Sequence, residues 1–170
     1  MSIEVGYYTG VGEHDVTVIP VRKLMEATGI GTILEKWNLV LRSGGATGFD
    51  TAFERGVQDP TNKVIYRSAS EQHYPDDLWA EAVKLVLETH PHPSSAHRFM
   101  NLLGRNAFQV LGDDLRTPSK FVVCWTSNGK DVGGTGTTIR IAKKYNIPIV
   151  NMYNRAISDV LGEIRRIIVP

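Results

Sequence analysis

The sequence lacks several features that would place it in a specialised class of protein. A single cysteine excludes a disulfide within the chain, so a reducing compartment is expected. The formal net charge of +1 argues against a protein built mainly to grip a nucleic-acid backbone. No apolar run approaches a membrane-spanning length, and the first residues lack the basic flank and apolar run of a signal peptide. We therefore expect a cytoplasmic protein without a membrane partner.

What is present is the composition of an ordinary globular protein. Hydrophobic residues make up 42% of the chain and charged residues 22%. The 170 residues suffice for one domain with a proper core. We find no internal repeat and no low-complexity segment, so residues 1–170 are expected to form a single nucleotide-binding domain.

Strand and helix patterns alternate along the chain. The expected strands are 3–8, 38–41, 63–66, 121–126 and 147–152. The expected helices are 21–37 with a break at 29–31, then 49–55, 76–88, 96–111, 139–145 and 157–168. Alternation of this kind predicts an α/β fold: one doubly wound, Rossmann-like domain with about five parallel strands and helices on both faces. Such sheets bind ligands at the carboxyl ends of their strands.

Two glycine-rich turns stand where a predicted strand passes into a helix. We call residues 44–48 the first glycine turn and residues 133–137 the second glycine turn. Glycines at a helix start leave backbone N–H groups uncovered, and the positive end of the helix dipole points the same way, which favours an anion such as phosphate. Glycine needed only for the backbone angles of a tight turn would give the same pattern.

With the ends of the first, second and fourth strands, these turns predict a site for a nucleotide. The expected ligand-binding residues are Tyr8, Thr9, Gly10, Ser43, Gly44, Gly45, Ala46, Arg105, Trp125, Thr126, Gly133, Gly134, Thr135, Gly136 and Thr137. Arg105 would offer a bidentate fork to phosphate, or lie on a helix surface. Trp125 would stack on a base, or cap the core. No cofactor is expected.

Residues 43–52 (SGGATGFDTA) resemble the Ser-Gly-x-Ala-x-Gly-x-Asp turn of the DprA/Smf DNA-processing proteins. Arg105-Asn106, followed by a strand and the second glycine turn, is similar to the lysine-decarboxylase-like LOG proteins, grouped with DprA as the SLOG superfamily. Small phage-type DprA-like proteins resemble the chain well, which would put it in a host cytoplasm. The resemblance implies a Rossmann-like fold that binds nucleotides, nucleotide-derived signals or single-stranded DNA.

The chain departs from the hydrolases of this group at one acid. The LOG enzymes carry a glutamate after their glycine turn, and that register falls here on Arg140 or Ile139. Cleavage of an N-glycosidic bond needs a carboxylate near the sugar. Asp50 and Glu54, or Asp131, are the candidate catalytic acids, although acids four residues apart are usually a solvated helix face.

Three functions therefore stay open. They are a nucleotide-binding sensor or sequestering protein, a nucleotide N-glycosidase, and a DprA-like protein that binds single-stranded DNA. The basic pairs at 22–23, 143–144 and 165–166 form no obvious stripe for DNA. His90, His92 and His97 lie in a proline-rich turn, and no metal site is expected. The apolar stretch with Leu102, Leu103, Phe108 and Val110 predicts a homo-oligomer.

Overall fold

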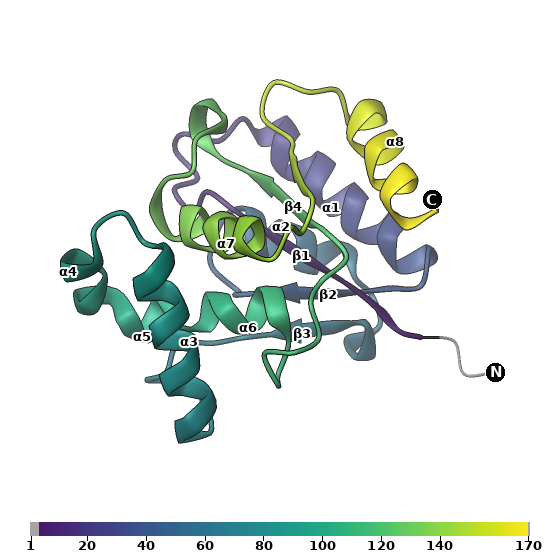
Figure 1. Cartoon of the computed structure of the whole chain (residues 1–170). Helices are drawn as coiled ribbons and strands as arrows, with labels where there is room; N and C mark the ends of the chain where they lie inside the picture. The colour runs from purple at the N-terminus through teal and green to yellow at the C-terminus, as the bar shows by residue number, and fades with distance from the viewer. Residues whose placement is uncertain (1–3, 170) are drawn as a thin grey trace.

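A computed structural model describes residues 4–169, and its strands form one parallel sheet (Figure 1). The order of the five strands is β3-β2-β1-β4-β5, and each neighbouring pair is parallel. The strands are β1 (Gly6–Gly12), β2 (Leu39–Ser43), β3 (Lys63–Ile65), β4 (Val122–Trp125) and β5 (Ile149–Asn151). This confirms the predicted α/β, Rossmann-like fold.

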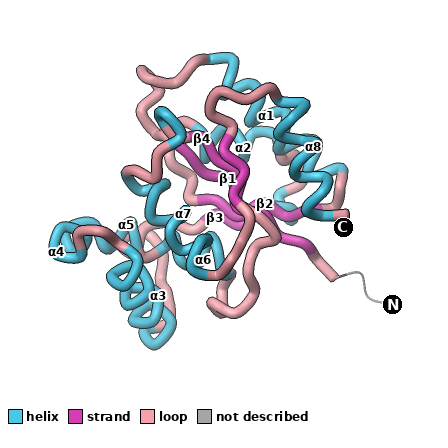
Figure 2. Tube along the Cα trace, turned by 45° about the horizontal axis from the view of Figure 1, so that its top comes forward, coloured by secondary structure: helices cyan, strands magenta, loops and turns pink. Residues whose placement is uncertain are grey.

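Helices cover both faces of the sheet, as Figures 1 and 2 show. One face carries α1 (Val21–Lys36), α2 (Phe49–Gly56) and α8 (Ile157–Ile168). The other carries α3 (Asp76–Thr89), α5 (Met100–Leu103), α6 (Arg105–Leu111) and α7 (Gly133–Lys144). The short helix α4 (Pro93–Ala96) lies beyond α3, away from the sheet. None of the helices within residues 4–169 is long and apolar enough to cross a membrane.

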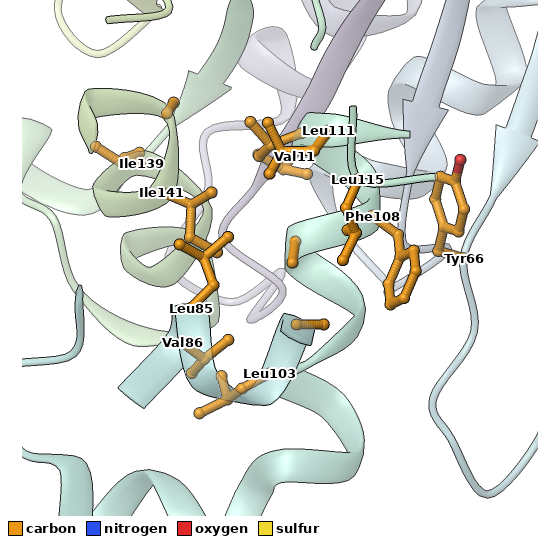
Figure 3. Close-up of a cluster of buried hydrophobic side chains, with 14 of the residues drawn as sticks. Val11, Tyr66, Leu85, Val86, Leu103, Phe108, Leu111, Leu115, Ile139 and Ile141 are labelled. Atoms are coloured by element: carbon orange, nitrogen blue, oxygen red, sulfur yellow. The ribbon is translucent and has the colours of Figure 1, made fainter. Parts of the chain in front are cut away.

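The sheet has a hydrophobic core on each face, and the apolar run at β4 contributes side chains to both. Val122 and Cys124 face the core under α3, α6 and α7, whereas Val123 and Trp125 face the core under α1, α2 and α8. Successive side chains of a strand point to opposite faces, so a strand covered on both sides must be apolar throughout. Figure 3 shows part of the first core, where Phe108 of α6 points toward Tyr66 and the apolar side chains of α3 and α7 lie close by.

The predicted break at 29–31 is wrong, because α1 runs without interruption from Val21 to Lys36. Gly31 instead lets α1 approach α2 closely, since a Cβ there would overlap the carbonyl oxygen of Phe53. Gly56 of α2 lies opposite Gly31, and a Cβ added to Gly56 would lie 3.0 Å from the Gly31 Cα. These glycines allow tight helix packing and do not end a helix.

Two other helix boundaries also differ from the prediction. The helix expected over 96–111 is divided into α4, a 3₁₀ turn at His97–Phe99, α5 and α6. The backbone at Gly104, between α5 and α6, lies against the ring of Trp79, where a Cβ would overlap it. Helix α7 begins at Gly133, earlier than the apolar pattern from Ile139, and the second glycine turn opens the helix as expected.

Candidate functional site

The carboxyl ends of the strands gather three segments around the middle of the sheet. These are the first glycine turn after β2, the segment 126–132 after β4, and the side of α6 that faces them. The chain leaves β1 toward β2 on one side and leaves β4 toward β5 on the other. The crevice between β1 and β4 is therefore the topological switch point, where sheets of this type bind ligands.

The structure does not place Tyr8, Thr9 and Gly10 at this edge. Strand β1 continues to Gly12, so these three residues lie in mid-strand, and the predicted start at Ile3 falls outside the described residues. Tyr8 is buried and stacks on Phe121. The Thr9 hydroxyl donates to the Gln109 carbonyl at 2.6 Å. Gly10 was interpreted as part of a turn, whereas in the structure it allows Leu41 and Phe53 to pack closely against the strand.

A carboxylate from within the protein occupies the first glycine turn. Asp50, in the first turn of α2, is 5% exposed. Its Oδ2 accepts the N–H groups of Gly44 at 3.2 Å and Ala46 at 3.4 Å, and its Oδ1 accepts that of Gly12 at 3.3 Å. The anion cradle predicted for this turn is thus filled by Asp50. The same contacts hold the end of β1 against the turn that follows β2.

Burial raises the pKa of Asp50 to about 6, and Arg105 and the three N–H groups partly offset this rise. Asp50 was a predicted catalytic acid, and so was Glu54. Glu54 lies one turn further along α2, where it pairs with Lys63 at 3.4 Å near the start of β3, away from the carboxyl edge. The two acids therefore share neither a solvated helix face nor a site.

The glycines of the first glycine turn are crowded by neighbouring residues as well. A Cβ on Gly44 would lie 2.6 Å from Gln109 Nε2 and 2.9 Å from Asp50 Oδ2. Gly45 and Gly48 have φ angles of +70° and +84°, which strongly favour glycine. The Ser43 hydroxyl donates to the Gly10 carbonyl at 2.6 Å. Ser43 and Gly44 are buried, Gly45, Ala46 and Gly48 are partly exposed, and Thr47 is exposed.

Arg105 braces the first glycine turn. Its Nη1 donates to the Gly44 carbonyl at 2.6 Å and to the Tyr66 carbonyl at 3.3 Å, while its Nε is buried without a hydrogen-bond partner among residues 4–169. The predicted fork toward a phosphate is thus directed at backbone oxygens of the segments after β2 and β3. The positive charge of the guanidinium also lowers the pKa of the Asp50 carboxyl.

The second glycine turn is open. Gly133 and Gly134 are exposed, and a Cβ on either would meet no atom within 4 Å. Gly136 N–H makes the first helical bond, to the Val132 carbonyl at 2.9 Å. The N–H groups of Gly133, Gly134 and Thr135 therefore precede the helical ladder, and α7 has neither a side-chain cap nor an acid in its first turn. The positive end of this helix dipole therefore lies at an exposed turn.

The end of the second glycine turn is buried in the protein. A Cβ on Gly136 would lie 2.7 Å from the backbone carbon of Asp131, so this glycine permits close packing. Thr137 is fully buried and its hydroxyl accepts from Arg140 Nη2 at 3.2 Å. These two predicted ligand residues face the interior. The accessible part of the turn is Gly133, Gly134 and the half-buried Thr135.

Two side chains of α6 connect the turns, and the residue-by-residue prediction missed both as site residues. Asn106 Nδ2 donates to the Gly134 carbonyl at 3.0 Å, and Gln109 Nε2 donates to Asn106 Oδ1 at 3.2 Å. Gln109 also lies beside Gly44, and its Oε1 is buried without a partner among the described residues. Polar residues in a buried helix were the available signal, because a buried amide is kept only where it has a partner.

Trp125 and Thr126, at the end of β4, are both buried. The ring of Trp125 stacks on Phe49 at 5.3 Å between centroids. The Thr126 hydroxyl accepts from Asn151 Nδ2 at 2.7 Å. Trp125 therefore caps the core, and it also lines a surface cleft. Its stacking on a base stays a prediction.

Most charges near the site already have partners. Asp131, the third candidate acid, pairs with Lys143. Among the predicted basic pairs, Lys23 is buried, and Lys144 pairs with Glu88 at 2.9 Å. The guanidinium of Arg165 lies 5.7 Å from the Trp37 ring centroid. These cations belong to separate helix faces and form no continuous basic groove.

Most of the apolar residues on which the predicted homo-oligomer was based are buried. Leu103, Phe108 and Val110 are buried in the core, and only Leu102 is exposed, with Phe99 as the nearest exposed apolar neighbour in the chain. The predicted homo-oligomer depends on this smaller patch. At the proline-rich turn, the imidazole of His90 accepts the His92 N–H at 3.0 Å. Among residues 4–169, no group of three or more His, Cys, Asp or Glu could hold a metal.

Comparison with known proteins adds no relative: no protein-family model, no curated protein and no solved structure matches this chain.

Proposed function

We propose that the protein binds a nucleotide or a nucleotide-derived molecule, with a phosphate group at the first turn of α7. The supporting observation is the set of three N–H groups at Gly133, Gly134 and Thr135, which precede the helical ladder at a turn whose two glycines are exposed and uncrowded. A helix start of this kind attracts a phosphate through its donors and its dipole together. No acid lies in this first turn, and Asp131, two residues before it, is paired with Lys143.

The position of this helix start supports a ligand larger than phosphate. It follows β4, next to the switch-point crevice between β1 and β4, where doubly wound sheets bind nucleotides. The side chain of Asn106 donates a hydrogen bond to the carbonyl of Gly134, which fixes the turn before a ligand binds. The resemblance of both glycine turns to the SLOG proteins points to the same ligand class.

The arrangement of acids favours binding over cleavage. The carboxylate of Asp50 is buried and already accepts three N–H groups, while Glu54 and Asp131 pair with lysines. A general base or a stabilising carboxylate must reach the reacting atoms. We therefore propose a sensor or sequestering protein over an N-glycosidase, and over a protein that binds single-stranded DNA.

Thermal unfolding in the presence of nucleotides tests this proposal. The panel comprises nucleoside monophosphates, ADP-ribose and cyclic dinucleotides, and the test variant is Gly134→Asp. A carboxylate at Gly134 would repel a phosphate there, yet an acid near a helix start stabilises the free protein. We expect stabilisation by the bound nucleotide to vanish while the ligand-free Tm stays the same or rises. Gly29→Asp, at an open glycine of α1, is the matched control and should keep the response.

The same ligands decide between binding and turnover. Near-stoichiometric protein is incubated with each nucleotide for hours, and chromatography measures the free base. Intact ligand recovered from the complex supports the proposal. Rapid release of base that Asp50→Asn or Glu54→Gln abolishes would make the protein an N-glycosidase. A nucleotide response that persists in Gly134→Asp would place the ligand elsewhere.

A further inference from the structure

An open cleft of about 550 Å³ lies at the carboxyl ends of β4 and β5, on the face covered by α1 and α8. Its wall includes Lys23 and Glu26 of α1, Trp125 of β4, and Tyr153 and Arg155 from the segment between β5 and α8. The volume falls in the range of small-molecule sites. The helices that bound it lie across the sheet from α7, so this cleft is separate from the second glycine turn (Figure 1).

A buried lysine forms part of the wall. Lys23 is 6% exposed, and its ammonium donates to Glu26 Oε2 at 2.9 Å and to the Arg155 carbonyl at 2.6 Å. An ammonium has three donors, so one N–H has no acceptor among the residues that the structure describes. Removing an ammonium from water costs several kcal/mol unless partners replace the water. A lysine held at a cleft wall with a spare donor suits an anionic ligand.

The charge around the cleft favours an anion. Three cations, Arg22, Lys23 and Arg155, line it against one carboxylate, Glu26, with which Arg22 and Lys23 both pair. Arg155 also pairs with Glu163 at 2.6 Å, so the three cations face two carboxylates. Both α1 and α8 also begin at the cleft, with Pro20 and Ala156 as their N-cap residues, and neither has a side-chain cap. The positive end of the α1 dipole adds to the positive side chains, whereas Asp159 in the first turn of α8 offsets that of α8.

Aromatic rings supply the apolar part of the wall. Trp125 and Tyr153 lie 5.8 Å apart between ring centroids, tilted by 59°. The Trp125 ring is fixed from behind by its stacking on Phe49, and Tyr153 is 36% exposed. The Tyr153 hydroxyl also donates to Asn128 Oδ1 at 3.1 Å, which fixes the direction of this ring. Two fixed rings beside cations suit a ligand with a flat ring and a negative group.

We propose that this cleft is a second binding site, for a small molecule that carries an aromatic ring and a phosphate or carboxylate group. Lys23 and Arg155 bind the anionic group, and Trp125 and Tyr153 contact the ring. Glu26 holds Lys23 in place and lowers the net positive charge, so it limits affinity. The proposal does not depend on ligand binding at α7.

Phenyl phosphate is the probe, with inorganic phosphate and phenol as its two halves. Titration of the ¹⁵N-labelled protein, followed by amide chemical shifts, locates each probe and gives its Kd. We expect saturable shifts at Lys23, Tyr153 and Ile157, with phenyl phosphate binding more tightly than either half. Lys23→Met keeps the apolar stem and should weaken binding about 10- to 100-fold, the equivalent of one hydrogen bond to a charged group. Lys84→Met, on the exposed side of α3, is the matched control.

Glu26→Gln separates a binding role of Lys23 from a purely structural one. If the lysine binds the anion, removing the competing carboxylate strengthens phenyl phosphate binding several-fold. If the ion pair only holds α1 in place, binding weakens or stays unchanged, and the proposal is overturned. Equal affinity for phenol and phenyl phosphate would also overturn it. Gly134→Asp must leave the phenyl phosphate Kd unchanged, because a loss there would put this ligand at α7.

Discussion

The two glycine turns have similar sequences and opposite surroundings. In the first, the N–H groups of Gly44 and Ala46 are taken by Asp50, and the turn is packed between α6 and the end of β1. In the second, Gly133 and Gly134 face open space with no acid nearby in the helix. The difference depends on one residue, since an acid in the first turn of a helix can fill the anion site that the helix creates.

The comparison teaches that glycine content alone does not identify a ligand cradle. Position 48 requires glycine because of its positive φ, and position 136 requires it because the backbone of Asp131 lies close. Neither reason applies at position 134. A glycine that is neither strained nor crowded has no structural reason to be glycine. Such positions are the better candidates for contact with a ligand.

The largest expected effect comes from one alanine in each turn. In Gly48→Ala, the new Cβ would overlap the carbonyl oxygen of Glu13 at a φ of +84°. Strain and overpacking together should cost about 3–5 kcal/mol of unfolding free energy. Gly134→Ala meets no atom and should stabilise α7 by up to ~1 kcal/mol. Urea denaturation measures both, and equal losses in the two variants would contradict the distinction between a closed and an open turn.

The charge inside the first glycine turn should appear in the pH dependence of stability. The pKa of Asp50 is raised by burial to about 6 from an ordinary value of 3.8, so the folded protein binds this proton more tightly than the unfolded chain. The contribution of Asp50 to the free energy of unfolding is fully present below about pH 4. It falls by about 3 kcal/mol as the pH rises through 6.

Asp50→Asn isolates that contribution. Exposed acids with a lowered pKa make stability rise with pH, but they do so equally in the wild type and in the variant, so their effect cancels in the difference. The difference in unfolding free energy, wild type minus variant, should fall between pH 4 and pH 6.5 and then level off. Urea denaturation across that range measures the difference. A difference that rises with pH would mean that the N–H groups and Arg105 outweigh burial.

Arg105→Met tests whether this residue belongs to the first turn or to a ligand. Loss of the bonds to the Gly44 and Tyr66 carbonyls should cost about 2 kcal/mol of stability. It should also raise the pKa of Asp50 further, because Arg105 lowers it. A double-mutant cycle with Asp50→Asn by urea denaturation measures that coupling. Unchanged stability with a large loss of nucleotide affinity would instead restore the predicted phosphate contact.

The fold was predictable from the sequence because it depends on local patterns. The run of five apolar residues at 121–125 fitted a strand covered on both faces, and alternating strands and helices implied a parallel sheet. The boundaries that failed involve glycine. Gly10, Gly31 and Gly104 lie where another segment approaches the backbone, and a single sequence does not show that neighbour.

The candidate site was predictable only in part, for the same reason. Both turns could be located, but whether a turn is filled depends on the direction of one side chain. Asp50 was interpreted as a candidate catalyst on an exposed face, whereas the helix directs it into the turn. Thr137 was assigned to the ligand because it lies in the second glycine turn, and Arg105 because of its bidentate fork and the resemblance, although their partners are in the protein.

The smallest effect concerns the connection between the turns. Asn106 donates to the Gly134 carbonyl and accepts from Gln109, which borders Gly44. Asn106→Ala should cost about 1 kcal/mol of stability, since one hydrogen bond is lost and Gln109 Nε2 loses its acceptor. It should also weaken nucleotide binding a few-fold, because Gly134 is no longer held before the ligand arrives. Asn101→Ala, on the exposed side of α5, is the control. Calorimetric titration measures affinity and urea denaturation measures stability. If stability falls while affinity does not, the open turn needs no support from α6, and the two turns act independently.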